Sequence, residues 1–404
     1  MLRETITHFN NSGSSVYGLF LDATKAFDRV DFAKLFDTLC SRNMNPIYMR
    51  CLLHMYSHQS LCVRWNGITS DTFLATNGVK QGGILSPLLF TAYVDGLVER
   101  LQASGEGCYI GPYFASFYGY ADDVCILAPN LKGLQTLADI CVEYAHEHKI
   151  LFNGSKSQLI KFQTGQQQQY SDDEKVLVCG NEVQCKNNVT HLGHTLYSNI
   201  LKDDTENIIK QMYRQFNSLR TRFNTALSQV RSELFTRNCT SFYGIQMCDL
   251  GKTQRLHTSY RKCLRCIWGI PSRSHNAILP PLTGKICSYH MCIKRFVKFA
   301  HTALQHHSPA VSYVFRNALQ HNNSIFAKNV KLCCTAWQVN NILTIEESSL
   351  ASTAADICRQ NCQTEVSIAI AGVIRELISV RDNTCSCLLL PHEVHHAINE
   401  LCTK

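Results

Sequence analysis

The chain has no long uninterrupted run of apolar residues. Hydrophobic side chains make up 45% of its 404 residues, so it can bury a large core, and the usual domain size predicts two or three domains. No stretch approaches the roughly 20 apolar residues that cross a bilayer. Met1–Asn10 also lacks a basic flank followed by an apolar run, so we expect neither a secretory signal nor a membrane partner. These absences favour an intracellular protein, in the nucleus or the cytoplasm.

Acidic residues are scarce in one part of the chain. Between Asn207 and Ile345, 19 Lys and Arg residues face only Glu233 and Asp249, whereas residues 1–200 hold 15 basic and 18 acidic residues. A basic half joined to a slightly acidic half predicts a polyanionic partner, most simply nucleic acid. The alternative is a solvated helical surface that happens to be basic, although such a surface usually mixes charges of both signs.

Cysteine, in contrast, is frequent. The count of 21 is odd, and most cysteines stand singly among apolar residues, as Cys40, Cys51, Cys62, Cys125 and Cys141 do. In an intracellular protein this pattern is typical of small buried hydrophobic residues and not of a disulfide framework.

Hydrophobic periodicity predicts strands and helices that alternate in the first half of the chain. Val16–Asp22 is expected to form a buried strand, and Phe114–Ala128 a hairpin with an acidic dipeptide at its turn. A second hairpin is predicted around Asn66-Gly67, from Leu61–Trp65 and Thr72–Thr76. Helices are predicted over Val30–Cys40, Ile47–His58, a segment capped by Ser86, and Leu131–His148. Beyond Lys202 the pattern is mainly helical, so the expected fold class is α+β with a helical second half.

Two acidic positions end or interrupt apolar strands: Asp22 closes Leu19–Asp22, and Asp122-Asp123 follows Tyr118–Ala121. A carboxylate beside a buried strand is costly unless a cation or a hydrogen-bond donor satisfies it. Hard oxygen ligands suit Mg²⁺, and two such ions would serve phosphoryl transfer. The alternative is an ordinary hairpin with acidic residues at a solvated tip.

Five segments carry a resemblance to a known family. They are Phe20–Asp28 (FLDATKAFD), Asn77–Phe90 (NGVKQGGILSPLLF), Tyr120–Asp123 (YADD), Phe152–Ser157 (FNGSKS) and His191–Gly193 (HLG). In this order, within residues 16–197, they resemble the motifs of reverse transcriptases in their non-LTR retrotransposon (LINE-type) form. The resemblance implies a right-hand polymerase palm, an antiparallel sheet with helices, over residues 1–197. Residues 198–404 would then form a basic, mainly helical thumb and C-terminal region.

The same resemblance implies an RNA-directed DNA polymerase that uses two Mg²⁺ ions, an RNA template, a DNA primer and dNTPs. Asp22 and Asp122 would be the main metal ligands, with Asp123 a weaker ligand or a support for the other two. The primer 3′-hydroxyl would attack the α-phosphate of the bound nucleotide, a reaction that depends on positioning and charge neutralisation.

Further roles follow from matched positions. Phe27 would exclude a ribose 2′-hydroxyl by its bulk. Gln81 and Gly82 would lie along the template base and the incoming nucleotide, where the lack of a side chain at Gly82 allows close approach, and Tyr120 would join this nucleotide-binding surface. Lys156 would assist departure of pyrophosphate as an acid; the alternative is a solvated surface lysine.

The chain departs from the family at its start. Only 19 residues precede Phe20, too few for the fingers segment that binds the triphosphate, and no endonuclease region is recognised. We therefore expect a truncated chain with an incomplete substrate site. The alternative function is a catalytically inactive remnant that only binds nucleic acid.

Two weaker signals concern zinc. His392–His396 (HEVHH) matches the HExxH motif of zinc proteases, but only eight residues follow it, so a protease is a remote alternative. Cys385, Cys387, His395 and Cys402 approximate a Cys/His tail that binds Zn²⁺. A second candidate ligand set is Cys263, Cys266, Cys287 and His290. For both sets, unligated buried cysteines remain the competing interpretation.

Overall fold

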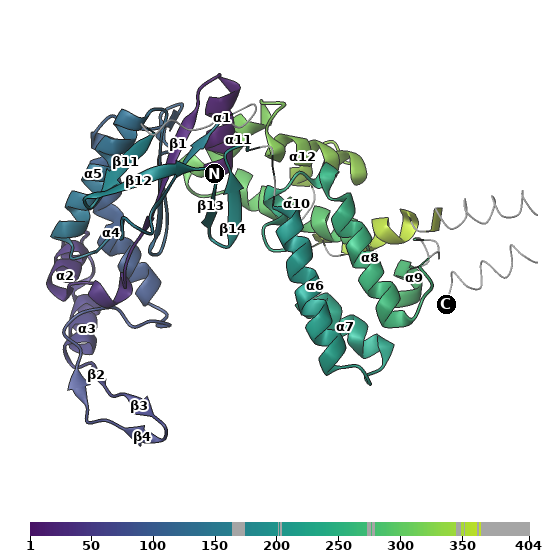
Figure 1. The fold of residues 1–404 in the computed structure, drawn as a ribbon, viewed down its shortest axis with the longest axis horizontal. Coiled ribbons are helices and arrows are strands. Elements are labelled where there is room, and N and C mark those ends of the chain that lie inside the picture. The colour runs from purple at the N-terminus through teal and green to yellow at the C-terminus, as the bar shows by residue number, and fades with distance from the viewer. Residues whose placement is uncertain are drawn as a thin grey trace, which may run out of the picture. The chain divides into compact units, whose positions relative to one another are not determined.

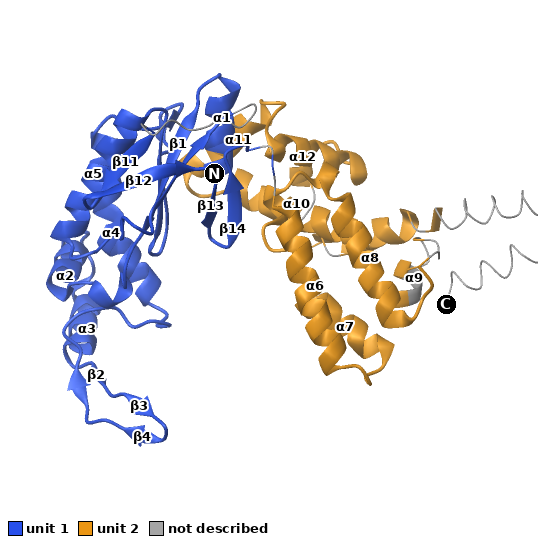
Figure 2. Ribbon diagram, viewed as in Figure 1, with its two compact units in different colours: residues 1–202 blue, residues 203–404 orange. Residues whose placement is uncertain are grey.

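A computed structural model describes residues 1–163, 174–200, 202, 204–272, 276, 279–344, 349–350, 352–361 and 363–364. The chain divides into two compact units, Met1–Lys202 and Asp203–Lys404 (Figure 2). Among the residues in these ranges, no helix is both long and apolar enough to cross a membrane.

The first unit is built on a six-stranded sheet with the order β11-β12-β10-β1-β9-β8 (Figure 1). These strands are β1 (Val16–Asp22), β8 (Phe117–Tyr120), β9 (Asp123–Ala128), β10 (Gln158–Phe162), β11 (Lys175–Val178) and β12 (Asn181–Lys186). All neighbours pair antiparallel except β10 with β12. The β1 strand lies near the middle of the sheet, between β9 and β10, which explains why it is apolar on both faces.

Each face of this sheet packs against a different layer. Because side chains alternate along a strand, Leu19, Leu21 and Ile126 enter a core with helices α4 (Ser86–Ala103) and α5 (Leu131–Glu147). Phe20, Cys125 and Leu127 enter a second core with Ile6 of helix α1 (Leu2–Asn11). This second core also holds Val189 of the hairpin formed by β13 (Asn188–His191) and β14 (His194–Tyr197). Burying each such large apolar side chain stabilises the fold by about 1.5–3 kcal/mol.

The remaining elements of this unit surround the sheet. Helices α2 (Phe32–Ser41) and α3 (Pro46–Ser57) begin at capping side chains, since Asp31 accepts from the Lys34 amide and Asn45 from the Ile47 amide. The hairpin predicted around Asn66-Gly67 forms as two short ladders. They are β2 (Ser60–Leu61) with β5 (Phe73–Leu74), and β3 (Arg64–Trp65) with β4 (Ile68–Thr69); β6 (Tyr109–Ile110) and β7 (Tyr113–Phe114) form another.

The prediction that Ser86 caps α4 is wrong. Leu85 occupies the capping position, and Ser86 is the first helical residue. Its hydroxyl donates to the carbonyl of Lys80 at 2.6 Å. Ser86 therefore closes the glycine-rich loop onto the helix, and Pro87 stands within the first turn, where its missing N–H costs nothing.

The second unit is helical, as the sequence pattern predicted. Its helices are α6 (Thr205–Arg222), α7 (Ser228–Asn238), α8 (Gln254–Trp268), α9 (Leu279–Thr283), α10 (Ser288–Leu304), α11 (Pro309–Leu319) and α12 (Ile325–Ala336). Buried aromatic rings form much of its core, among them Phe235 against Tyr260 and Phe296 against Phe326. Together the two units give the expected α+β fold: a mainly antiparallel sheet with helices, followed by helices.

Candidate active site

Three acidic residues lie at one end of the sheet. Asp22 is the last residue of β1 and Asp123 the first of β9, and the two are direct partners in the antiparallel register. Directly opposed residues have Cβ atoms about 4.5–5.5 Å apart and share a face of the sheet. Asp122 lies in the turn between β8 and β9, next to Ala121, whose φ is 54°. The sheet thus brings residues about 100 positions apart in the chain to the same end, and we call Asp22, Asp122 and Asp123 the acidic cluster.

All three carboxylates are exposed, which differs from the premise that burial makes them costly. The strands end where these side chains begin, so water solvates the carboxylates while Leu21 and Val124 beside them remain buried. The carboxylate oxygen atoms are therefore open to solvent and to a cation alike.

The loop Phe152–Ser157 holds the end of β1 in place. The Asn153 amide donates to the Asp22 carbonyl at 2.8 Å, and the Asp22 amide donates to the Ser157 hydroxyl at 3.4 Å. A Cβ added to Gly154 would lie 2.4 Å from the Val178 carbonyl oxygen, so this loop also packs tightly on the β11–β12 turn. Lys156 is exposed in the same loop. This loop therefore supports the backbone of Asp22.

The glycine-rich loop is fastened to the turn that holds Phe27. The Val79 amide donates to the Phe27 carbonyl and the Gly78 amide to the Val30 carbonyl, both at 2.8 Å. The Gln81 side-chain amide donates to the Asp28 carboxylate at 3.4 Å. The Asn77 side-chain amide donates to the Asp28 carbonyl at 3.0 Å. Four hydrogen bonds must therefore break before the two segments can separate.

Phe27, Gly82 and Tyr120 differ in how the chain constrains them. The half-buried Phe27 ring stacks on Phe90 with centroids 4.8 Å apart, so its position is determined by packing. Gly82 has a φ of 77° and no atom within 4 Å of an added Cβ. Within the chain, its conformation and not crowding favours glycine. The Tyr120 side chain is 69% exposed.

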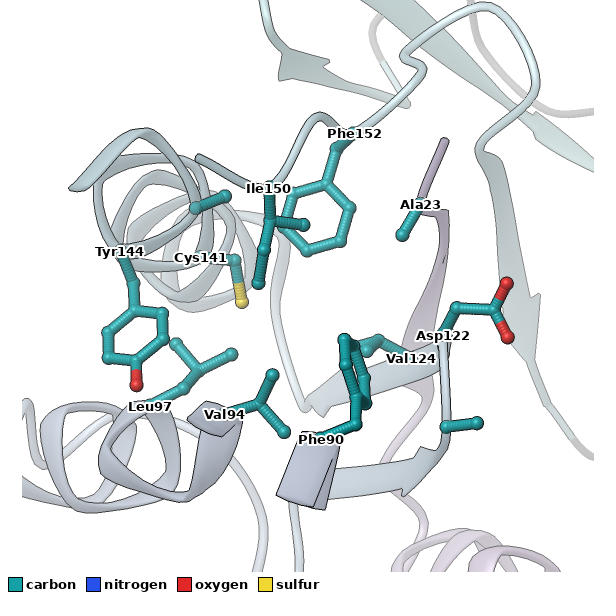
Figure 3. A pocket seen from close by; sticks show the side chains of 12 residues that line it. Ala23, Phe90, Val94, Leu97, Asp122, Val124, Cys141, Tyr144, Ile150 and Phe152 are labelled. Carbon is teal, nitrogen blue, oxygen red and sulfur yellow. The ribbon is translucent and has the colours of Figure 1, made fainter. Parts of the chain in front are cut away.

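A small cavity lies beneath the acidic cluster (Figure 3). Its volume is about 20 Å³, and its lining is mostly apolar, with Phe90, Leu97 and Phe152 among its walls. The Asp122 carboxylate is directed away from it (Figure 3). A space of this size holds about one water molecule, so any substrate of the cluster must lie on the open surface.

His191 is a neighbour of the cluster to which the sequence analysis assigned no role. It ends β13, and its ring packs on Phe20 with centroids 4.9 Å apart. Burial lowers the pKa of His191, and the negative charge of Asp123 opposes that shift. The HLG segment was recognised in the sequence, but nothing in its spacing indicated that His191 would lie near Asp123.

The structure brings two of the predicted zinc ligands together with a third cysteine. The ligand atoms of Cys287, His290 and Cys358 all lie within 4.8 Å of one another. The sequence had grouped Cys287 and His290 with Cys263 and Cys266, but in the structure Cys263 is buried and Cys266 exposed on α8, and neither belongs to this group. Both C-terminal signals, at 385–402 and 392–396, lie outside the described residues.

Comparison with known proteins bears on the first half of the chain. The family described as reverse transcriptase (RNA-dependent DNA polymerase) matches residues 2–196. The Pol polyprotein of the type-2 retrotransposable element R2DM from Drosophila melanogaster is 30% identical over 156 residues, which cover 39% of this chain and 14% of that protein. The uncharacterized 149 kDa protein of transposon TX1 from Xenopus laevis is 28% identical over 159 residues, covering 39% of this chain and 12% of that protein.

A solved structure, apo telomerase from Candida tropicalis, aligns with 78% of this chain and 55% of that chain, at 12% identity and a TM-score of 0.43. This likeness is too distant to bear on function. The chain spans less than a quarter of the curated relatives' length in every alignment, at most 24%. Five motifs in family order, the strand pairing that joins the acidic residues, and the family match agree, and residues 2–196 therefore belong to the reverse transcriptase family, in the form found in non-LTR retrotransposons.

Proposed function

We propose that this chain is an RNA-directed DNA polymerase that transfers nucleotides from dNTPs to a primer 3′-hydroxyl with two Mg²⁺ ions. The observation that carries the proposal is the register of β1 with β9, in which Asp22 stands opposite Asp123 with Asp122 in the adjoining turn. Three exposed carboxylates at one end of the sheet offer hard oxygen ligands on an open surface. Such ligands fit Mg²⁺ that is shared with substrate phosphates.

In this proposal Asp22 and Asp122 hold the ions, and Asp123 supports them from the neighbouring strand position. Ions held there would supply activation of the attacking hydroxyl and neutralisation of the charge on the leaving oxygens. The chain contributes position: the Asn153 and Ser157 hydrogen bonds hold the backbone of Asp22, because a displacement of about 1 Å can cost a hundredfold in rate. Lys156 is exposed on the same loop and in this proposal would protonate the departing pyrophosphate.

Selection of the nucleotide is assigned to the segment that joins Phe27 to the glycine-rich loop. The Phe27 ring cannot swing aside without leaving its stacked contact with Phe90, so its bulk would exclude a 2′-hydroxyl. Gln81 is anchored to Asp28, and the open space above Gly82 leaves room for a base or sugar. Tyr120, exposed beside the acidic turn, would complete this surface.

The basic second unit would bind the template–primer backbone. Helix α6 exposes four cations, Lys210, Arg214, Arg220 and Arg222. Its apolar side is meanwhile buried through Ile209, Met212 and Phe216. Cations on the solvent face of an otherwise well-packed helix attract phosphates without sequence preference.

The test is extension of a DNA primer on an RNA template by the purified chain with Mg²⁺, beside Asp122→Asn. This substitution keeps the shape of the side chain and removes its charge, so we expect the extension rate to fall by roughly a hundredfold or more. Asp71→Asn, which removes an equally exposed charge from the distant β4–β5 segment, is the matched control and should leave the rate unchanged. Template–primer binding without extension by the unsubstituted chain would instead establish the inactive nucleic-acid-binding alternative.

A further inference from the structure

A cleft of about 620 Å³ opens in the second unit and includes no residue of the acidic cluster. Its walls come from α8, α9, α10 and the helical residues 352–361. Cys287, His290 and Cys358 lie together in this wall. We propose that these three residues bind a Zn²⁺ ion, which joins the beginning of α10 to residues 352–361.

The chemistry of the three side chains suits this metal. Two thiolates and an imidazole are a soft to borderline donor set that selects Zn²⁺ over Mg²⁺ or Ca²⁺. The spacing Cys287-x-x-His290 brings two ligands onto the first turn of one helix, and Cys358 supplies the third from a segment about 70 residues further on. The three residues line the cleft, so water from the cleft would supply the fourth ligand.

The geometry is close to that of a bound ion. Two sulfurs bound tetrahedrally at about 2.3 Å from zinc stand about 3.8 Å apart. The ligand atoms here lie within 4.8 Å of one another, so a small rotation of each side chain would close the site. Cys358 and His290 are 2% and 3% exposed, so packing already holds two of the three ligands.

A second, independent observation points to a missing ligand. The Nδ1 atom of His290 is buried without a hydrogen-bond partner. Its other nitrogen, Nε2, lies 3.4 Å from the side-chain amide of Asn361. A metal-binding histidine typically has this arrangement, in which one nitrogen binds the ion while a neighbouring polar group orients the ring through the other. A buried polar atom with no partner is otherwise uncommon in a folded protein.

The local charge favours the thiolate form of the cysteines, which is the form that binds zinc. Cys287 immediately precedes α10, where unpaired backbone N–H groups favour an anion. Arg261 and Lys285 line the same cleft, and no acidic side chain does so among the residues that form its described wall. Binding releases the two thiol protons as the ion takes their place.

The experiment must separate this site from the C-terminal Cys/His residues. We would replace Cys385, Cys387 and Cys402 by Ser in the full chain and measure zinc per chain by mass spectrometry of the metal. One equivalent is expected to remain, to be lost in Cys287→Ser or Cys358→Ser, and to survive in Cys266→Ser, which removes an exposed thiol from the neighbouring helix. Zinc content that does not change in the first two variants, or the absence of zinc from the background protein, would overturn the proposal.

A measurement without substitution at the site guards against variants that fail to fold. The unsubstituted chain would be alkylated before and after removal of zinc by a chelator, and each cysteine read by peptide mass spectrometry. Labelling of Cys287 and Cys358 should rise severalfold on zinc removal, while labelling of Cys266 stays the same. Equal labelling of Cys287 and Cys358 in both samples, or a Cys287–Cys358 disulfide in the untreated protein, would refute zinc binding there.

Discussion

Replacement of Gly78 by alanine tests how the glycine-rich loop is held. Gly78 has a φ of 85°, and a Cβ added there would lie 2.9 Å from the Asp28 carbonyl oxygen and 3.0 Å from its Cα. The backbone of Asp28 cannot turn aside as a flexible side chain would. We therefore expect Gly78→Ala to push the loop away from the turn that carries Phe27.

The magnitude follows from two contributions. An alanine at positive φ costs about 1–2 kcal/mol, offset by about 0.4–1 kcal/mol through the smaller entropy of the unfolded chain. Relief of the clash also weakens the hydrogen bonds from the Gly78 and Val79 amides, each contributing about 0.5–1.5 kcal/mol. The sum is a loss of about 2–4 kcal/mol in the free energy of unfolding.

Gly82→Ala is the matched control, because Gly82 lies in the same loop at a φ of 77° with nothing near an added Cβ. Gly82→Ala introduces the same strain of an alanine at positive φ but no clash with a neighbour. It should therefore lower the free energy of unfolding by about 1 kcal/mol or less. Urea unfolding of the two variants gives the difference, and hydrogen exchange of the Val79 amide reports the loop itself. Equal costs for the two substitutions would refute the role of the contact with Asp28.

Three further outcomes are expected. Burial lowers the pKa of His257 to about 4, below its ordinary 6.5, so the folded state binds fewer protons. The free energy of unfolding should thus be about 2 kcal/mol lower at pH 5 than at pH 7. In urea unfolding at the two pH values, His257→Gln should show a smaller difference. Burial raises the pKa of Cys141 to about 12, so iodoacetamide at pH 8 should label exposed Cys51 and spare Cys141 in peptide mass spectra; equal labelling would contradict the packing. Asn329→Ala should lower the free energy of unfolding by about 2–5 kcal/mol, because it removes the hydrogen bonds that Asn329 makes with the buried Leu250 amide and with the Cys248 carbonyl. Exposed Asn340→Ala should change the free energy of unfolding by less than about 0.5 kcal/mol.

Local structure near the acidic cluster was predictable because its signals are short-range. The apolar run that ends at Asp22 and the dipeptide Asp122-Asp123 between apolar segments indicated a strand and a hairpin turn, and both form. The helix over Leu131–His148 forms with an end shifted by one residue. Periodicity carries this information because each element buries one recurring set of side chains.

Partnerships between distant segments were not predictable in the same way. An apolar strand can pair with any of several other strands. The apolar run of β1 therefore did not indicate that Asp123 would be the partner of Asp22. Cys358 escaped notice as a companion of His290 because nothing in its own surroundings resembles a ligand spacing. The wrong prediction for Ser86 has a related cause. A serine before a proline is typical of a helix cap, but the Ser86 hydroxyl donates to the Lys80 carbonyl instead. The conformation of the loop, and not the helix, determines this partner.

The central position of β1 has a consequence for biosynthesis. This strand is buried on both faces and pairs with β9 and β10, the last of which ends about 140 residues later in the chain. At about 5–20 residues per second, a ribosome needs roughly 7–30 s to make that length. For this interval the nascent strand carries unsatisfied backbone groups and an apolar surface, and is a natural substrate for a chaperone. Translation that slows between residues 22 and 162 would lengthen the exposure, so aggregation of the newly made chain should respond to codon choice in that interval.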